Sequence, residues 1–417
     1  MNIAIVGAGI NGITTALELA RDGHQVTVYE QNNTAAEEAS FAPGGWLQPS
    51  AALSLAAPGA GMPLSQLQKQ AGLLQASAMI GSPAWRWMRQ WKKHEKAASQ
   101  EAQPHFATAL HTLSAYSQSL RWREAEVPCE LAECTQGALL MLRTPQEAAF
   151  WTERLPFLQS QGLSCQMLDA PQVQAIEPGI GNEIAWLQAL HFPQGESINP
   201  RLWSQYLRQH AQDLGVLFQT GLRIEALSTH PLGVTAGQRL HLHEAIVLCT
   251  GASTDLLAHV QVKLPCISAW GYSITSPVRD PLLAPRASIM DWAQQTTIGR
   301  LGQRIRITSG LELGSHASAP HHTATLQRMY RLLNDWFPGG AQLSSPQVQT
   351  WRGSRAILPD GLPAVGASGK SGIWLNLTHG SHGAALASGC ARALADMLAG
   401  HAPALDMQAF DPLRFHP

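Results

Sequence analysis

The fold is decided by residues 2–30, which read NIAIVGAGINGITTALELARDGHQVTVYE. Residues 2–6 form a short apolar run typical of a strand that is buried on both faces. Residues 13–22 place apolar side chains on one face at helical spacing, and Gly23 ends this segment. Residues 25–29 read as a second strand, with Glu30 at its end. The stretch therefore predicts a strand, a glycine-rich turn, a helix and a second strand.

Each glycine of the turn has a physical role. Gly7 permits the tight bend, Gly9 lets the backbone approach a pyrophosphate, and Gly12 lets the helix and the strand pack closely. The N-terminus of the helix offers unpaired N–H groups and the positive end of its dipole to phosphates. Glu30 is placed to accept hydrogen bonds from ribose hydroxyls, and an acid here disfavours the 2′-phosphate of NADP. We therefore expect a dinucleotide-binding unit.

Length and charge narrow the class of protein. At 417 residues the chain exceeds the size at which one core keeps growing, so two domains are expected. It carries 28 Lys and Arg against 29 Asp and Glu, and this near balance argues against a nucleic-acid binder. The 6 cysteines are scattered, without a C-x-x-C pair or zinc-type histidine spacing. We expect no metal site and free thiols in a reducing, cytoplasmic compartment.

Three segments raise the question of a membrane. The N-terminus has no basic leader of the secretory type. The uncharged stretch Ala39–Gln68 contains 4 prolines and several glycines, so we expect an ordered loop and not a spanning helix. The tryptophan-rich segment 84–123 carries interleaved Arg and Lys. We favour an amphipathic helix whose aromatic side chains pack on a second domain over a nucleic-acid or membrane surface. Peripheral contact with the inner face of a membrane stays open.

The rest of the chain separates FAD from NAD. An NAD dehydrogenase continues through further βα units, whereas this chain turns at once into a Pro/Gly-rich stretch. Further landmarks follow in order along nearly the whole sequence: 7–12, Glu30, 39–45, 198–200, 247–252, 270–272, 351–355, 359–361 and 378–383. In these landmarks the chain resembles the D-amino acid oxidase and dehydrogenase family of FAD-dependent oxidoreductases. Within that family it is most similar to the small subunit of the bacterial dehydrogenases, and glycine and sarcosine oxidases are more distant.

The resemblance implies FAD as the cofactor. The binding is expected to be non-covalent. Related enzymes of the sarcosine oxidase type attach the flavin through a cysteine late in the chain, whereas the late cysteine here, Cys390, falls inside a helix pattern. A helix that begins near residues 379–383 would present the positive end of its dipole to negative charge on a reduced flavin. The expected cofactor-binding residues are Gly7, Gly9, Ile10, Asn11, Gly12, Glu30, Gln31, Ser40, Gly44, Gly45, Trp46, Leu47, Ile224, Thr250, Gly251, His379, Gly380, Ser381, His382 and Gly383.

Arg355 and Tyr272 are the expected catalytic residues. An amino acid substrate needs its carboxylate held, and arginine offers a charged bidentate fork for it. Arg355 matches the family position that has this role. The family usually has a proline next, where this chain has Ala356, so Arg352 is the alternate. A competing interpretation pairs the arginine with a local acid such as Asp360. Tyr272 matches a family tyrosine near the pocket, although a strand favours tyrosine in any case.

Two further groups of side chains receive weaker roles. Arg304 and Arg306 share one face of an alternating strand, and we favour a solvated face there over a second carboxylate contact. His379 and His382 belong to the turn expected beside the flavin. We do not assign either of them as a catalytic base, because in the family the substrate amine binds deprotonated.

The expected fold is α/β, with a discontinuous FAD-binding Rossmann-like domain and a mixed-sheet (α+β) substrate domain. The first is expected to comprise residues 1–60, 195–260 and 350–417, and the second residues 61–194 and 261–349. The resemblance implies hydride transfer from the Cα of a D-amino acid to flavin N5. The imino acid then hydrolyses to a keto acid and ammonia, and a quinone, an electron-transfer chain or oxygen accepts the electrons.

Three other functions stay open on the sequence. The first is oxidation of glycine, sarcosine or a hydroxyproline-like imino acid by an oxidase or dehydrogenase of the same family. The second is a tRNA-modifying flavoenzyme, because residues 378–383 also resemble the late motif of that group, but the balanced charge disfavours it. The third is a flavin-binding subunit without activity, which the presence of Arg355 disfavours.

Overall fold

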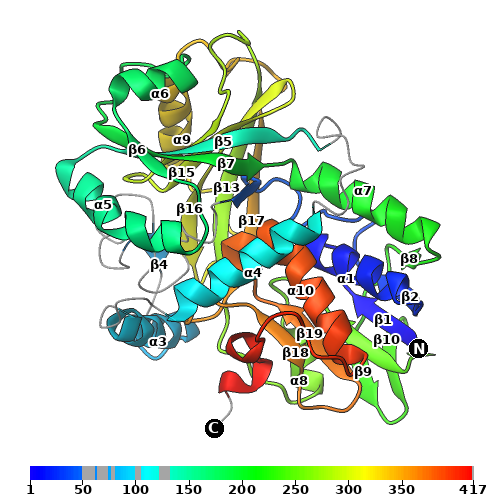
Figure 1. Cartoon of the computed structure of the whole chain (residues 1–417). Coiled ribbons are helices and arrows are strands. Elements are labelled where there is room, and N and C mark those ends of the chain that lie inside the picture. Colours follow the sequence, from blue (N-terminus) through cyan, green and yellow to red (C-terminus); the bar gives the residue numbers. More distant parts are fainter. Residues whose placement is uncertain (49–61, 63–73, 77–79, 99–104, 122–131, 416–417) are drawn as a thin grey trace.

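The computed structural model describes residues 1–48, 62, 74–76, 80–98, 105–121 and 132–415. The chain is organised around two large sheets, with the helices α1, α7 and α10 beside one and α5, α6 and α9 beside the other (Figure 1). The tryptophan-rich helix α3 (Pro83–Ala98) contacts the second of these sheets, and the next helix, α4 (His105–Arg121), packs on α10 beside the first. Both sheets are built from segments that are far apart in the sequence, which confirms the expected α/β class.

The first sheet has six strands, and each is short and apolar. In order they are β18 (Ala364–Ala367), β19 (Ile373–Leu377), β12 (Ala245–Leu248), β1 (Asn2–Val6), β2 (Gln25–Tyr29) and β8 (Leu217–Gln219). The β18–β19 pair is antiparallel and the other pairs are parallel. Helix α1 (Ile10–Arg21) packs against α7 (Pro200–Asp213) and α10 (Gly383–Leu398). β1 and β12 are apolar without alternation because these helices cover one face of the sheet, while Leu227, Val234 and Leu256 cover the other.

The predicted strand–turn–helix–strand unit is confirmed, and its glycines are required by the packing. Gly7 has φ +105°, and a Cβ on it would lie 2.5 Å from the carbonyl oxygen of Cys249. A Cβ on Gly12 would lie 1.9 Å from the carbonyl oxygen of Gly7. The helix begins earlier than residue 13, because Gly9 is its N-cap and Ile10 its first residue. The turn therefore consists of residues 7–9 alone.

The second sheet is mixed and has ten strands. In order it contains β17 (Gln349–Ile357), β13 (Ile267–Pro277), β16 (Arg304–Leu313), β15 (Thr296–Leu301), β14 (Ser288–Asp291), β5 (Thr135–Leu142), β7 (Gln188–Ser197) and β3 (Trp46–Gln48), while β4 (Leu74–Ala76) pairs with β16 and β6 (Gln166–Leu168) with β7. Helix α9 (Thr323–Trp336) packs on one side, where Met329 and Trp336 join a cluster with Ile289. Helices α5 (Pro145–Ser160) and α6 (Ala170–Ile176) complete this part.

The tryptophan-rich segment was predicted to be helical from about Ala84 to Arg123, and its described residues are helical. They form α3 (Pro83–Ala98) and α4 (His105–Arg121), and residues 99–104 lie outside the described part. Trp87 and Trp91 are buried in one cluster with Trp151 and Phe192. These aromatic side chains therefore pack on the ten-stranded sheet, since residues of β5 and β7 belong to the same cluster.

Smaller elements complete the chain. A three-stranded sheet, β9 (Ala226–Thr229), β10 (Leu232–Ala236) and β11 (Arg239–Leu242), is followed by α8 (Asp255–His259), and the 3-10 helices η2 (Gly380–His382), η3 (Gln408–Phe410) and η4 (Pro412–Phe415) lie near the C-terminus. β3 and β17 belong to the ten-stranded sheet, although the segments 1–60 and 350–417 were assigned to the other domain. The domain division itself stays a prediction.

In the described part of the chain, every helix is too short or too polar to cross a membrane. The predicted loop over Ala39–Gln68 falls within the described residues only as far as Gln48 and at Met62. Over that portion it holds the short strand β3 and buries Met62 against Trp87 and its neighbours.

Candidate active site

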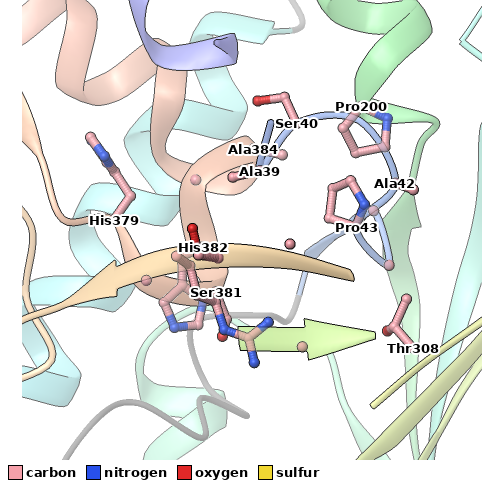
Figure 2. Close-up of a pocket in the computed structure, with 18 of the residues that line it drawn as sticks. Ala39, Ser40, Ala42, Pro43, Pro200, Thr308, His379, Ser381, His382 and Ala384 are labelled. Atoms are coloured by element: carbon pink, nitrogen blue, oxygen red, sulfur yellow. The ribbon is translucent and has the colours of Figure 1, made fainter. Parts of the chain in front are cut away.

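A cavity of about 230 Å³ lies where the two sheets approach one another. Its walls come from the N-terminus of α1, the loop 39–46, the strands β13, β16 and β17, and the turn that leads into α10. Figure 2 shows Ser40, Pro43 and Thr308 on the side of the pocket opposite His379. Segments from both ends of the sequence therefore form a single pocket.

The N-terminus of α1 forms one end of the pocket. Ile10 and Asn11 line it, and the Ile10 N–H donates to the Ser40 hydroxyl at 3.0 Å. Glu30 lies behind the turn, where its Oε2 accepts from the Ala8 N–H at 2.8 Å and its Oε1 accepts twice from Asn32. A carboxylate has about four lone-pair positions. Three of them are used, so Glu30 keeps one for a hydroxyl of a ligand.

The turn between β19 and α10 forms the opposite wall. His379, Ser381 and His382 line the pocket, and Gly383 begins α10. Burial lowers the pKa of His379 to about 3 and that of His382 to about 4. Both imidazoles are therefore neutral at pH 7. The Nε2 of His379 is buried and has no hydrogen-bond partner among the described residues.

Arg355 is the cation of the pocket. It lies on β17, half-buried, and its Nη2 donates to the carbonyl of Gly310 at 3.2 Å. Gly271 makes room for it, because a Cβ there would lie 3.2 Å from Nη1. Desolvation lowers the pKa of Arg355 to about 10, and its Nε has no partner among the described residues.

Arg355 also lacks a counter-ion in the described chain. The acid proposed as a local partner, Asp360, instead binds Arg414 at 2.7 Å. Every lining residue that the structure describes is neutral or basic, without an aspartate or glutamate. A desolvated cation without a carboxylate is unfavourable, and an anionic ligand would relieve this. The pocket is therefore chemically suited to a carboxylate.

Tyr272 also lines the pocket, but its hydroxyl is engaged elsewhere. The hydroxyl donates to Oε1 of Glu312 and accepts from the His322 N–H at 2.8 Å. Arg352 binds the same carboxylate at 2.8 Å and stacks over the ring of Trp270. Arg352, the alternate to Arg355, is thus neutralised by Glu312, and Tyr272 presents its ring to the pocket.

The prediction of a solvated strand face at Arg304 and Arg306 is wrong for Arg306. Arg304 is partly exposed and pairs with Glu133 at 2.9 Å, as expected at a surface. Arg306 is 7% exposed, and it donates to the hydroxyl of Thr275 and the carbonyl of Pro43. The loop 39–46 therefore covers this face of the strand at Arg306 but not at Arg304, which sequence periodicity does not reveal.

The predicted site residues divide into two groups. Those that line the pocket are Ile10, Asn11, Ser40, Gly44, Gly45, Trp46, Gly251, Tyr272, Arg355, His379, Gly380, Ser381, His382 and Gly383. Those outside its lining are Gly7, Gly9, Gly12, Glu30, Gln31, Leu47, Ile224 and Thr250. Leu47 and Ile224 are buried in apolar clusters, and Gln31 is exposed.

Several lining residues were not predicted, among them Met290, Gln295, Thr297 and Thr308. Thr308 could have been found only together with the burial of Arg306. Thr308 follows Arg306 by two residues, and alternate residues of a strand share a face. Once Arg306 is known to be covered, Thr308 belongs to the covered face as well.

The chain is similar to known proteins over nearly its whole length. A family model described as "DAO: FAD dependent oxidoreductase" matches residues 2–397. The chain belongs to this family. Two named relatives match along nearly their whole length. A D-amino acid dehydrogenase of Bradyrhizobium diazoefficiens is 31% identical over 424 residues, covering 100% of this chain and 99% of the relative. A D-amino acid dehydrogenase of Cereibacter sphaeroides is 32% identical, covering 97% and 93%.

Solved structures with the same fold also span the chain. Glycine oxidase from Geobacillus kaustophilus has a TM-score of 0.72 at 19% identity and covers 99% of this chain and 98% of its own. L-amino acid deaminase from Proteus vulgaris has a TM-score of 0.72 at 18% identity and covers 99% and 93%. At these identities the likeness shows the fold. The protein is accordingly a DAO-family enzyme, and FAD is its cofactor.

The pocket of this DAO-family enzyme fits FAD. A Cβ on Gly9 would meet nothing nearer than the Ser40 hydroxyl at 3.5 Å, so the backbone is open to a phosphate there. Asn11 Oδ1 and His379 Nε2 are buried without partners among the described residues, as expected of groups that await a ligand. Cys390 is buried in the core of α10, where its Sγ lies outside the pocket lining.

Proposed function

We propose that this enzyme catalyses the oxidative deamination of a D-amino acid. The observation that carries the proposal is Arg355, a desolvated cation without an acidic partner among the described residues, in the pocket that fits FAD. A carboxylate of the substrate would neutralise it through a bidentate pair. When bound, non-covalent FAD supplies the acceptor for a hydride from the substrate Cα. The imino acid formed hydrolyses in water to a keto acid and ammonia.

The pocket favours a substrate whose amine is neutral. An ammonium group would meet Arg355 and no described acid in the lining, while a neutral amine meets no such repulsion. His379 and His382 are neutral at pH 7, because burial lowers their pKa values to about 3 and about 4. We therefore assign them no proton transfer. Arg355 orients the substrate, and the Tyr272 ring and the loop 39–46 exclude water.

Support for the D configuration comes from the curated relatives, which are named D-amino acid dehydrogenases and match over the full length at 31% and 32% identity. The solved structures include enzymes named for glycine and for L-amino acids, so this fold serves several amino acids. Configuration is therefore the property that the first experiment has to measure.

The test is anaerobic mixing of the purified yellow enzyme with D-amino acids, L-amino acids, glycine, sarcosine and proline analogues, followed by the absorbance of the flavin. We expect rapid bleaching by D-amino acids. In Arg355→Gln, kcat/KM should fall at least about 100-fold, because roughly 3 kcal/mol is lost with a charge-assisted bidentate pair. The control is Arg304→Gln, which removes a surface cation of the neighbouring strand β16.

Each outcome is informative. Bleaching by glycine, sarcosine or a proline analogue alone would replace the D-amino acid by that substrate. Bleaching by no amine, or wild-type kinetics in Arg355→Gln, would refute the proposal. Admission of air to the reduced enzyme then separates an oxidase, which reoxidises at once, from a dehydrogenase that needs a quinone or another carrier.

A further inference from the structure

Arg306 is a second buried cation, and the proposed reaction does not use it. It lies on β16 with 7% of its surface exposed. Its Nε donates to Thr275 Oγ1 at 2.9 Å and its Nη1 to the carbonyl oxygen of Pro43 at 3.1 Å. Among the described residues no carboxylate lies within ion-pair distance of Arg306; Glu133 acts on it only from further away and forms its ion pair with Arg304. Burial lowers the pKa of Arg306 to about 10.

The two hydrogen bonds do not by themselves require a charge. A neutral amide could donate to the same hydroxyl and the same carbonyl, and burying a charge without a counter-ion is unfavourable. Arg304, which lowers the pKa of Arg306, opposes the more distant Glu133, which raises it, so the charge is expected to act on a further partner besides Thr275 and Pro43. That partner would be an anion close enough to feel an unscreened cation in a low-dielectric interior.

The backbone at Pro43 and Gly44 contacts both Arg306 and the pocket, because the Pro43 carbonyl accepts from Arg306 while Pro43 and Gly44 line the pocket together with Thr308. Figure 2 shows Pro43 and Thr308 at the pocket. Gly44 lies directly on the sheet, because a Cβ there would fall 2.8 Å from the hydroxyls of both Thr297 and Thr308. The C=O and N–H of a trans peptide point in opposite directions. Since the Pro43 carbonyl points to Arg306, the Gly44 N–H points away from it.

We propose that Arg306 is a positioning residue that raises the reduction potential of the bound flavin, through its charge and through the peptide Pro43–Gly44. Two-electron reduction adds negative charge to the flavin. A fixed cation bound to the backbone that lines the pocket, with a peptide N–H polarised by it, stabilises that charge. Arg355 and Arg306 then have separate tasks, because Arg355 holds the substrate and Arg306 acts on the cofactor.

The test is a spectroelectrochemical titration of the holoenzyme and of three variants. Arg306→Gln keeps a neutral donor, Arg306→Lys keeps the charge, and Arg304→Gln removes the exposed cation two residues earlier on the same face. We expect Arg306→Gln to lose at least a tenfold preference for reduced over oxidised flavin, a fall of about 30 mV in the two-electron midpoint potential. Arg306→Lys should retain most of the wild-type potential, and Arg304→Gln should retain all of it.

Two results would overturn the proposal. One is a wild-type midpoint potential in Arg306→Gln, which would leave Arg306 as a tie between the loop and the sheet. The other is an equal fall in Arg306→Gln and Arg306→Lys, which would assign the effect to hydrogen-bond geometry. If Arg306→Gln does not retain flavin, Thr275→Asp places a carboxylate against the guanidinium and Thr275→Asn does not. The potential should then fall in Thr275→Asp alone, and an unchanged potential there counts against the proposal.

Discussion

Three histidines of this enzyme are buried so deeply that they resist protonation. Burial lowers the pKa of His111, on α4, to about 4. It also lowers the pKa of His379 to about 3 and that of His382 to about 4. The unfolded chain takes up protons at its histidines near the ordinary value of 6.5, while the folded chain does not. The stability that these residues provide is therefore present above pH 6.5 and is lost as the pH falls towards 4.

His111 lies outside the lining of the proposed active site, so its substitution leaves the pocket residues in place. In His111→Gln the loss of unfolding free energy between pH 7.5 and pH 4.5 should be smaller than in the wild type by on the order of 3 kcal/mol. Urea unfolding at the two pH values measures it, and His230→Gln, at an exposed position, is the control. An unchanged pH dependence in His111→Gln would mean that its imidazole is accessible to protons in the folded enzyme.

At the scale of the element, two glycines at the junction of β1 and α1 have different roles: Gly12 is required for folding and Gly9 for cofactor binding. A Cβ on Gly12 would lie 1.9 Å from the backbone of Gly7, whereas a Cβ on Gly9 would meet nothing within 3.4 Å and its φ of −72° suits alanine. Gly12→Ala should therefore lower the Tm by several degrees, through overpacking that costs about 1–3 kcal/mol.

Gly9→Ala should leave the Tm of the flavin-free enzyme unchanged and reduce the flavin content, because the methyl group fills space that a pyrophosphate needs. Differential scanning and the ratio of flavin to protein absorbance measure the two effects. Full flavin content in Gly9→Ala would show that the phosphates approach elsewhere.

The same turn shows what sequence reasoning can reach. Residues 2–30 determine a local unit, so spacing and residue type were sufficient to predict β1, α1 and β2. Arg355 could be selected because its match to a family position is local too. The burial of Arg306 depends on the loop 39–46 crossing β16, which is a contact between distant segments. Likewise, the Glu312 carboxylate that occupies the Tyr272 hydroxyl lies on another strand. Pairings of that kind are absent from any local pattern.

At the scale of the whole molecule, the balance of charge predicts its solubility. The net charge is −1 and the sequence pI is about 7.0. Proteins near zero net charge associate most readily. We expect a solubility minimum near pH 7 and a rise on either side, measured as turbidity of the concentrated enzyme at low ionic strength. Added salt should reduce the contrast. A solubility that falls steadily from pH 6 to pH 9 would contradict this.

The six-stranded sheet joins the two ends of the chain, since β12 lies between β1 and β19 and the Asn376 amide donates to the Thr15 hydroxyl at 2.9 Å. On the ribosome, residues 7–12 therefore emerge well before the turn 378–383 that completes the pocket. While the residues between them are being made, the nascent chain carries half a flavin site. The cofactor meets its complete site only after β19 and the turn that follows it have been made, and a chain that terminates before β19 retains its glycine turn without the wall that closes the pocket.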